Sequence, residues 1–101
     1  MKSTHNIRLD ECERKALRKA LDNFKGEVYI FGSRLDPSKK GGDIDLLLVP
    51  HTDVKPLELE IEIQTKFFME CEEDIDVLVY RDTPFFREIL RSAKRIDPKE
   101  L

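Results

Sequence analysis

Three aspartates have the type and spacing that metal-dependent phosphate chemistry requires. Asp43 and Asp45 stand two residues apart at the start of the apolar run Ile44 to Val49, and Asp76 lies in a later apolar run, Ile75 to Tyr80. Residues two apart in a strand point to the same face of a sheet. If the two runs are neighbouring strands, the carboxylates gather at one end of one face. A divalent cation would relieve the repulsion between them.

Oxygen ligands alone favour Mg²⁺, with Mn²⁺ as the alternative. Asp74 shares the expected face of Asp76 and is the substitute third carboxylate if Asp76 points away. Each motif also has a purely structural explanation. Any half-exposed strand alternates apolar and acidic residues, and the pair Gly32-Ser33 suits an ordinary turn.

Several other kinds of site do not fit the sequence. A calcium-binding EF-hand loop needs a third acid where Leu47 stands, and a P-loop needs a Gly-Lys pair where Gly42 meets Asp43. Cys12 and Cys71 are too far apart in sequence, and too far from the histidines, to form the close ligand pairs of a zinc site. No serine–histidine arrangement supports acyl transfer.

The hydrophobic pattern predicts the elements that would position these residues. The chain has a periodic helix over Leu9 to Phe24, strands over 28–31, 44–49 and 75–80, a connector over 32–42, and a helix from Thr83-Pro84 to about Lys94. The run Leu57 to Ile63 alternates with period two like an exposed strand, but it continues into Phe67 with helical spacing, and we favour a helix.

This order predicts an α+β fold (an α/β two-layer arrangement) in which a small mixed sheet of about three strands has helices packed on one face. The 101 residues fit a single domain, 1–101, and 40% hydrophobic residues can supply its core. Basic and acidic residues are mixed, with a net charge of −3, so we expect no long nucleic acid partner. Without a signal peptide or long apolar segment, we expect a cytoplasmic chain with reduced thiols and no membrane association.

The motifs together resemble a known active-site signature. A strand ends in Gly32-Ser33, the connector 34–42 follows, Asp43-x-Asp45 opens the next strand, and Asp76 lies in "IDVLV". This set resembles the nucleotidyltransferase superfamily with the DNA polymerase β-like palm. The stretch "FGSR…GGDIDLL" is most similar to the minimal nucleotidyltransferases, the type often paired with a HEPN-domain protein. The resemblance implies the palm fold of that superfamily.

The resemblance also implies roles for individual residues. Asp43, Asp45 and Asp76 would be catalytic and would hold two Mg²⁺ ions. Asp43 and Asp45 would hold the ion on the triphosphate, and Asp76 would complete the second metal site. Gly32 would let the backbone approach a phosphate, and Ser33 would donate to the β- or γ-phosphate. Arg34 would add a charge-assisted contact to the nucleotide, with a surface salt bridge as the equal alternative.

The connector departs from the family pattern. Many relatives have a glycine soon after Gly-Ser-Arg and a serine just before Asp-x-Asp, where this chain has Asp36-Pro37 and Gly41-Gly42. This departure affects the contacts expected between the connector and the nucleotide, and not the three aspartates. Lys39 and Lys40 could replace those phosphate contacts or could simply be solvated, and we favour solvation.

The function implied by the resemblance is a Mg²⁺-dependent transfer of a nucleoside monophosphate, most simply AMP from ATP, with release of pyrophosphate. The acceptor would be a hydroxyl on a partner HEPN-type protein, and this chain would be the antitoxin-like member of the pair. The alternative is a non-catalytic nucleotide- or partner-binding module of the same fold that acts by docking, for example through the acidic stretch Asp53 to Asp76. An exposed sheet edge would also allow a homo-oligomer.

Overall fold

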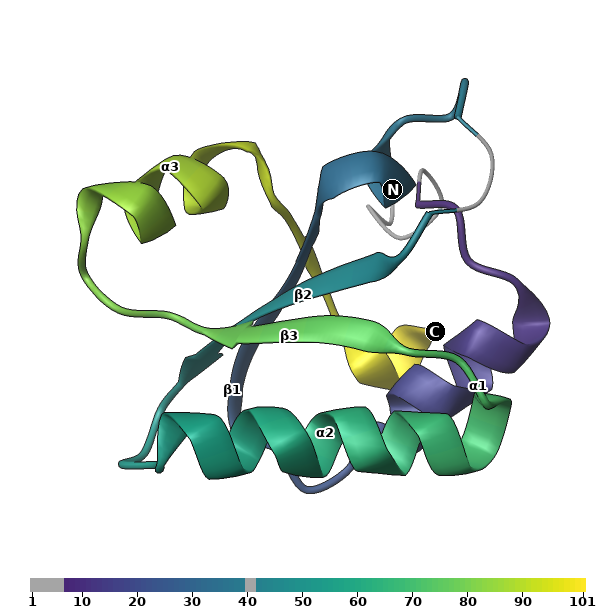
Figure 1. Ribbon diagram of the computed structural model, residues 1–101, viewed down its shortest axis with the longest axis horizontal. Coiled ribbons are helices and arrows are strands. Elements are labelled where there is room, and N and C mark those ends of the chain that lie inside the picture. Colours follow the sequence, from purple (N-terminus) through teal and green to yellow (C-terminus); the bar gives the residue numbers. More distant parts are fainter. Residues whose placement is uncertain (1–6, 40–41) are drawn as a thin grey trace.

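The computed structural model describes residues 7–39 and 42–101 (Figure 1). Lys40 and Gly41 lie outside the described residues, and so does the expectation for Lys40. The elements follow in the order α1 (Glu11–Ala20), β1 (Gly26–Phe31), the 3₁₀ helix η2 (Gly32–Leu35), β2 (Ile44–Pro50), α2 (Pro56–Cys71), β3 (Ile75–Val79), α3 (Pro84–Ser92), β4 (Lys94–Ile96) and the 3₁₀ helix η3 (Pro98–Glu100). None of the described helices is long and apolar enough to cross a membrane.

The strands form one mixed sheet in the order β3-β2-β1-β4. β1 pairs antiparallel with β2 and with β4, whereas β2 and β3 run parallel. The parallel pair requires a crossover, which α2 supplies. The α+β fold class is therefore confirmed, with one strand more than the three expected from the sequence.

α1 begins at a reciprocal cap. The Asp10 carboxylate accepts from the backbone N–H of Glu13 at 2.8 Å, and the Glu13 carboxylate accepts from the backbone N–H of Asp10 at 2.9 Å. This capping box satisfies two of the backbone donors that every helix start leaves without a partner. Ala16, Leu17 and Ala20 then bury one face of α1 against the sheet.

The ambiguous segment is a helix, as we favoured. In α2 the buried side chains Ile63 and Phe67 are four residues apart, so they lie on one face of the helix. α2 ends at Cys71 and is capped by Glu72, whose left-handed backbone (φ 53°) turns the chain and whose N–H donates to the Phe68 carbonyl at 2.8 Å. The period-two alternation is thus only a local coincidence within a helical pattern.

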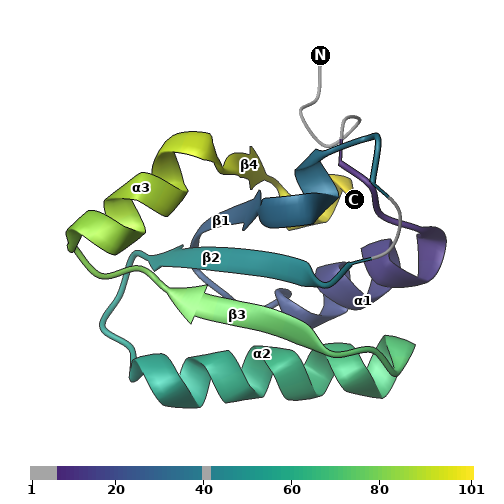
Figure 2. The ribbon, with the colours of Figure 1, turned by 45° about the horizontal axis from the view of Figure 1, so that its top comes forward.

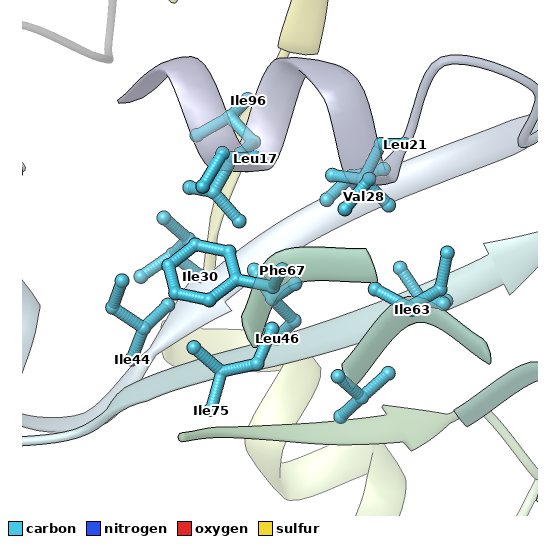
Figure 3. Packing of buried hydrophobic residues seen from close by; sticks show 14 of the residues in the cluster. Leu17, Leu21, Val28, Ile30, Ile44, Leu46, Ile63, Phe67, Ile75 and Ile96 are labelled. Carbon is cyan, nitrogen blue, oxygen red and sulfur yellow. The ribbon is translucent and has the colours of Figure 1, made fainter. Parts of the chain in front are cut away.

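The hydrophobic core lies between the sheet and the layer formed by α1 and α2 (Figures 1 and 3). The ring of Phe67, fully buried, lies among Ile30, Ile44, Leu46 and Ile75 from β1, β2 and β3 (Figure 3). The aspartates of β2 and β3 lie on the opposite face, because they alternate with these buried residues.

The C-terminal part differs most from the expectation. Thr83 caps α3 and Pro84 begins it, as predicted, but the helix ends at Ser92 and Lys94–Ile96 forms β4 beside β1. α3 also lies on the side of the sheet away from α1 and α2 (Figures 1 and 2). The sequence could not show β4, because a three-residue strand with two basic residues and only Ile96 buried has no strand pattern.

Candidate active site

The predicted motifs meet at one end of the sheet. β1 ends at Phe31, whose partner across the antiparallel pair is Asp45, so the following Gly32–Leu35 turn lies beside the start of β2. β3 runs parallel to β2 and begins at the same end. Figure 2 shows the turn, the starts of β2 and β3 and the start of α1 at this end, with α3 at the other.

Asp45 and Asp76 are direct partners in the register of β2 and β3. The pKa of Asp45 is raised to about 6, first by its burial, then by a hydrogen bond with Asp76 and by the negative charges of Asp76 and Asp43. Two carboxylates that close favour sharing a proton. This end of the sheet therefore carries more negative charge than it can hold without a proton or a cation.

Asp43 precedes β2 and is exposed, with the buried Ile44 between it and Asp45. Its charge contributes to the raised pKa of Asp45, so the three predicted carboxylates form one electrostatic group. Asp74 is exposed and is not among the charges that act on Asp45. The geometry thus gives no reason to assign Asp74, in place of Asp76, as the third carboxylate of the site.

Two glycines allow the turn to pack against these groups. Gly32 has φ +81°, and a Cβ there would collide with the Oδ2 atom of Asp45. Gly42 has φ +85°, and a Cβ there would collide with the Oγ atom of Ser33. Both positions therefore require glycine for their backbone and for the close approach. Ser33 consequently lies against the returning chain at Gly42, one residue after the glycine that approaches Asp45.

The described residues supply no cation to this group. No lysine or arginine of the described chain forms an ion pair with Asp43, Asp45 or Asp76. Three oxygen donors with excess negative charge are the ligand set that Mg²⁺ or Mn²⁺ prefers. The three aspartates therefore offer donors of the right type for a divalent cation. Among the described residues, however, only the ligand atoms of Asp10, Glu13 and Glu73 all lie within 4.8 Å of one another, so Asp43, Asp45 and Asp76 do not form a closed three-ligand cluster in this structure.

Arg34 does not have the role expected from the sequence. Its side chain is only 10% exposed and points into the protein, where Nη1 and Nη2 each donate to one carboxylate oxygen of Glu13 at 2.8 Å. Nε donates to the Gly42 carbonyl at 3.0 Å, and Nη1 also donates to the Arg8 carbonyl at 2.7 Å. These bonds hold the guanidinium inside the protein in a buried salt bridge, whereas the alternative expected from the sequence was a salt bridge at the surface.

A second group of carboxylates lies behind the turn. The side chains of Asp10, Glu13 and Glu73 offer oxygens within 4.8 Å of one another, a spacing that could hold a metal ion. Asp10 already caps α1, however, and Glu13 already pairs with Arg34. The Arg34 guanidinium therefore supplies much of the positive charge that would balance these carboxylates.

Glu13 and Arg8 were not predicted to be near the site. Arg8 donates from Nη2 to the Ser33 carbonyl and from Nε to the Asp36 carbonyl, both at 2.9 Å. One sequence signal could have found Glu13: it shares helical spacing with Ala16, Leu17 and Ala20, so a charged residue falls on the buried face of α1. A charge in that position implies a buried partner of opposite sign.

Neither a scan against protein-family models nor a search of the curated proteins gave a match for this sequence. The similar solved structures include two toxin–antitoxin complexes. One is the toxin–antitoxin complex MntA–HpeT, crystallised with two aspartate-to-glutamate substitutions two positions apart. It has a TM-score of 0.59 and 15% identity, over 81% of this chain and 70% of the other. The second is a tri-AMPylated HEPN toxin of Shewanella oneidensis in complex with an MNT antitoxin. It has a TM-score of 0.51 and 18% identity, over 85% of this chain and 68% of the other.

These neighbours are minimal nucleotidyltransferase antitoxins in complex with HEPN toxins. The resemblance that the Gly-Ser and Asp-x-Asp motifs indicated is therefore confirmed at the level of the fold.

Proposed function

We propose that this chain is a Mg²⁺-dependent nucleotidyltransferase that moves a nucleoside monophosphate, AMP from ATP in the simplest case, onto a hydroxyl of a HEPN-type partner. It would act in the cytoplasm as the antitoxin-like member of the pair. One observation supports this most strongly: Asp45 faces Asp76 across two parallel strands while Gly32 packs against Asp45. The free cysteines Cys12 and Cys71 suit a reducing compartment.

The neighbours support the choice of partner and reaction. One of them contains an AMPylated HEPN toxin, and the other carries substitutions at two aspartates with the spacing of Asp43 and Asp45. Both are complexes of a toxin with its antitoxin. By analogy of fold, we assign this chain the same kind of partner and AMP as the transferred group.

The residues of the chain would divide the work as follows. Asp43 and Asp45 would hold a metal ion on the side of the triphosphate, and Asp76 would hold one on the side of the attacking hydroxyl. Two Mg²⁺ ions held by these aspartates would neutralise the triphosphate and would lower the pKa of the hydroxyl. Ser33, which follows Gly32 in the turn, would donate its hydroxyl to a phosphate oxygen. The new bond joins the acceptor oxygen to the α-phosphorus, and the bond from the α-phosphorus to the bridging oxygen of pyrophosphate breaks.

Asp45 must lose its shared proton before it can bind a cation. Its pKa of about 6 leaves most of the molecules ready at neutral pH. The sheet face also excludes water from part of this group, because Asp45 is half-buried. Partial burial strengthens each charge interaction at the site.

A labelled-nucleotide transfer experiment tests the proposal. The chain, Mg²⁺ and a HEPN-domain partner are incubated with ATP labelled at the α-phosphate and, separately, at the γ-phosphate. We expect the partner to retain the α label and not the γ label, and to lose the signal with Asp76→Asn. Transfer of the γ label would indicate a kinase-type reaction, and no transfer of either label would contradict the proposal.

The second candidate is a binding module that acts by docking. It is favoured by exposed apolar side chains on α2, where Leu57, Ile61 and Met69 are 67%, 53% and 76% exposed. Such side chains in one helix commonly mark a protein interface. A docking module would keep its protective effect on the partner in the Asp76→Asn variant, whereas the enzyme would not.

A further inference from the structure

The two buried charged residues of the described chain form a pair behind the candidate site. Glu13 is 3% exposed and Arg34 is 8% exposed, and their side chains meet through two parallel N–H to carboxylate bonds. Burying a charged pair costs desolvation, so such a pair is weak evidence for stability alone. Its location, directly beneath the Gly32–Leu35 turn, suggests another use.

Arg34 joins the two ends of the connector. It belongs to the turn after β1, yet its Nε donates to the carbonyl of Gly42, at the point where the chain returns to β2. Gly42 also lies against the hydroxyl oxygen of Ser33. The position of the Arg34 guanidinium therefore fixes how closely the returning chain approaches Ser33.

The segment before α1 fixes the turn from the other side. The N–H of Arg8 donates to the Arg34 carbonyl at 3.1 Å, and Arg34 donates back to the Arg8 carbonyl. The Arg8 side chain also bonds the carbonyls of Ser33 and Asp36, at the two ends of the turn. Arg8 thus bonds two carbonyls of the turn, those of Ser33 and Arg34, and the carbonyl of Asp36 that follows it.

Glu13 is itself held firmly. Burial would raise its pKa, but hydrogen bonds from Arg34, from the Asp10 backbone and with Glu73 lower the pKa to about 2. The carboxylate therefore stays ionised at neutral pH. Because Glu73 lies just before β3, Glu13 connects α1 with the turn and with the segment that leads to Asp76.

We infer that Glu13, acting through Arg34, is a positioning residue for the nucleotide site: the buried pair holds the Gly32–Ser33 turn against the Gly42 end of the connector. This inference rests on the proposed function for its nucleotide readout, but the hold on the turn can be measured without nucleotide.

Amide hydrogen exchange in the nucleotide-free protein tests the hold on the turn. The amides of Asp36 and Arg8 report it, because they donate to the Ser33 and Arg34 carbonyls, and the Tyr80 amide, bonded to the Leu48 carbonyl, is the distant reference. We expect the exchange of Asp36 and Arg8, relative to Tyr80, to rise at least tenfold in Glu13→Gln and in Arg34→Lys. Glu11→Gln, an exposed acid of the same helical turn, and Ile63→Val, a mild core change, should leave the ratio unchanged. An unchanged ratio in both test variants overturns the inference.

Titration with ATP and Mg²⁺ tests the consequence for the site. We expect Glu13→Gln to weaken the apparent affinity at least tenfold, while the Ile63→Val and Glu11→Gln controls bind like the wild type. Equal affinity of Glu13→Gln and wild type would overturn the positioning role. If the wild type bound no nucleotide while the exchange result held, the proposed function would fail and the hold on the turn would stand.

Discussion

Asp45 of β2 and Asp76 of β3 are direct partners in a parallel pair of strands, so their carboxyl groups are held together by backbone hydrogen bonds rather than by a flexible loop. In this arrangement the ionised form of Asp45 is disfavoured, and its pKa is raised to about 6. Such mutual destabilisation is expected where a site is built for a cation that the apo protein lacks.

The first prediction concerns the stability of the apo protein against pH. The folded pKa of Asp45 is above its ordinary value of 3.8, so the folded state binds this proton more tightly than the unfolded state. Stability should therefore rise as the pH falls from about 7 toward about 4, by about 1–2 kcal/mol after allowance for partial exposure. Urea unfolding at several pH values, with a chelator present, measures the effect.

Asp45→Asn should remove this rise and should stabilise the apo protein at pH 7 by a similar amount. Asp74→Asn is the matched control, because it removes an exposed carboxylate nearby. If Asp45→Asn and Asp74→Asn showed the same pH profile as the wild type, the shared proton between Asp45 and Asp76 would be contradicted.

Glu13 should produce an opposite effect at lower pH. Its folded pKa of about 2 is below the ordinary 4.5, so its contribution is present above about pH 4.5 and is lost as the pH falls toward 2. The loss should be about 3 kcal/mol. In a plot of unfolding free energy against pH, Glu13→Gln should reduce the loss of stability between about pH 4.5 and 2, whereas Glu11→Gln should keep that loss. An equally large loss in Glu13→Gln would show that the buried pair is not its source.

Gly32→Ala should disturb the site more than a surface change of the same size. The backbone there has φ +81°, and the added Cβ meets the Asp45 carboxylate. We expect a loss of about 1–3 kcal/mol in the free energy of unfolding. Ser38→Ala, on the exposed part of the same connector, should cost less than about 0.5 kcal/mol. Chemical denaturation of both variants measures the difference, and equal stability would argue against the close approach of Gly32 to Asp45.

Two side chains of α2 protect the exposed edge of β3. The Glu60 carboxylate accepts from the Val79 N–H at 3.0 Å, and the Gln64 amide donates to the Ile75 carbonyl at 3.1 Å. Exposed strand edges favour pairing with another chain. The double variant Glu60→Ala, Gln64→Ala should therefore self-associate more than the wild type in analytical ultracentrifugation.

The control for this prediction is Glu58→Ala, Thr65→Ala, which removes one acid and one polar group from the exposed side of the same helix. It should sediment like the wild type. A double variant at positions 60 and 64 with unchanged sedimentation would mean that these side chains do not guard the edge.

The sequence contained enough information for most of the fold. Periodic apolar residues place α1, β1, β2 and β3, and the cap Thr83 sets a helix start that the structure retains. α1 is shorter than the predicted Leu9 to Phe24: it begins after the cap Asp10, which we did not single out in the sequence, and it ends at Ala20. The Asp-x-Asp spacing also predicted which face carries the carboxylates. The strand β4 was missed because its stability comes from pairing with β1, a long-range contact with no local pattern.

The role of Arg34 could not be read from the motif. Gly-Ser-Arg next to a phosphate site suggests an arginine that faces the ligand, and local sequence does not show which way the side chain turns. Its direction is set by Glu13, which is 21 residues earlier in the chain. The charged residue on the buried face of α1 was the available signal, and it becomes meaningful only once its partner is known.

The most direct test of the account is a thermal melt of the wild type and of Asp43→Asn with ATP, GTP, CTP and UTP, each with and without Mg²⁺. A nucleotide at 100 times its Kd stabilises by about 2.7 kcal/mol, which corresponds to a rise in Tm on the order of 10 °C for a domain of this size. The account predicts a Mg²⁺-dependent rise with at least one nucleotide that is lost in Asp43→Asn. No rise with any nucleotide, or a rise that Asp43→Asn retains in full, would contradict it.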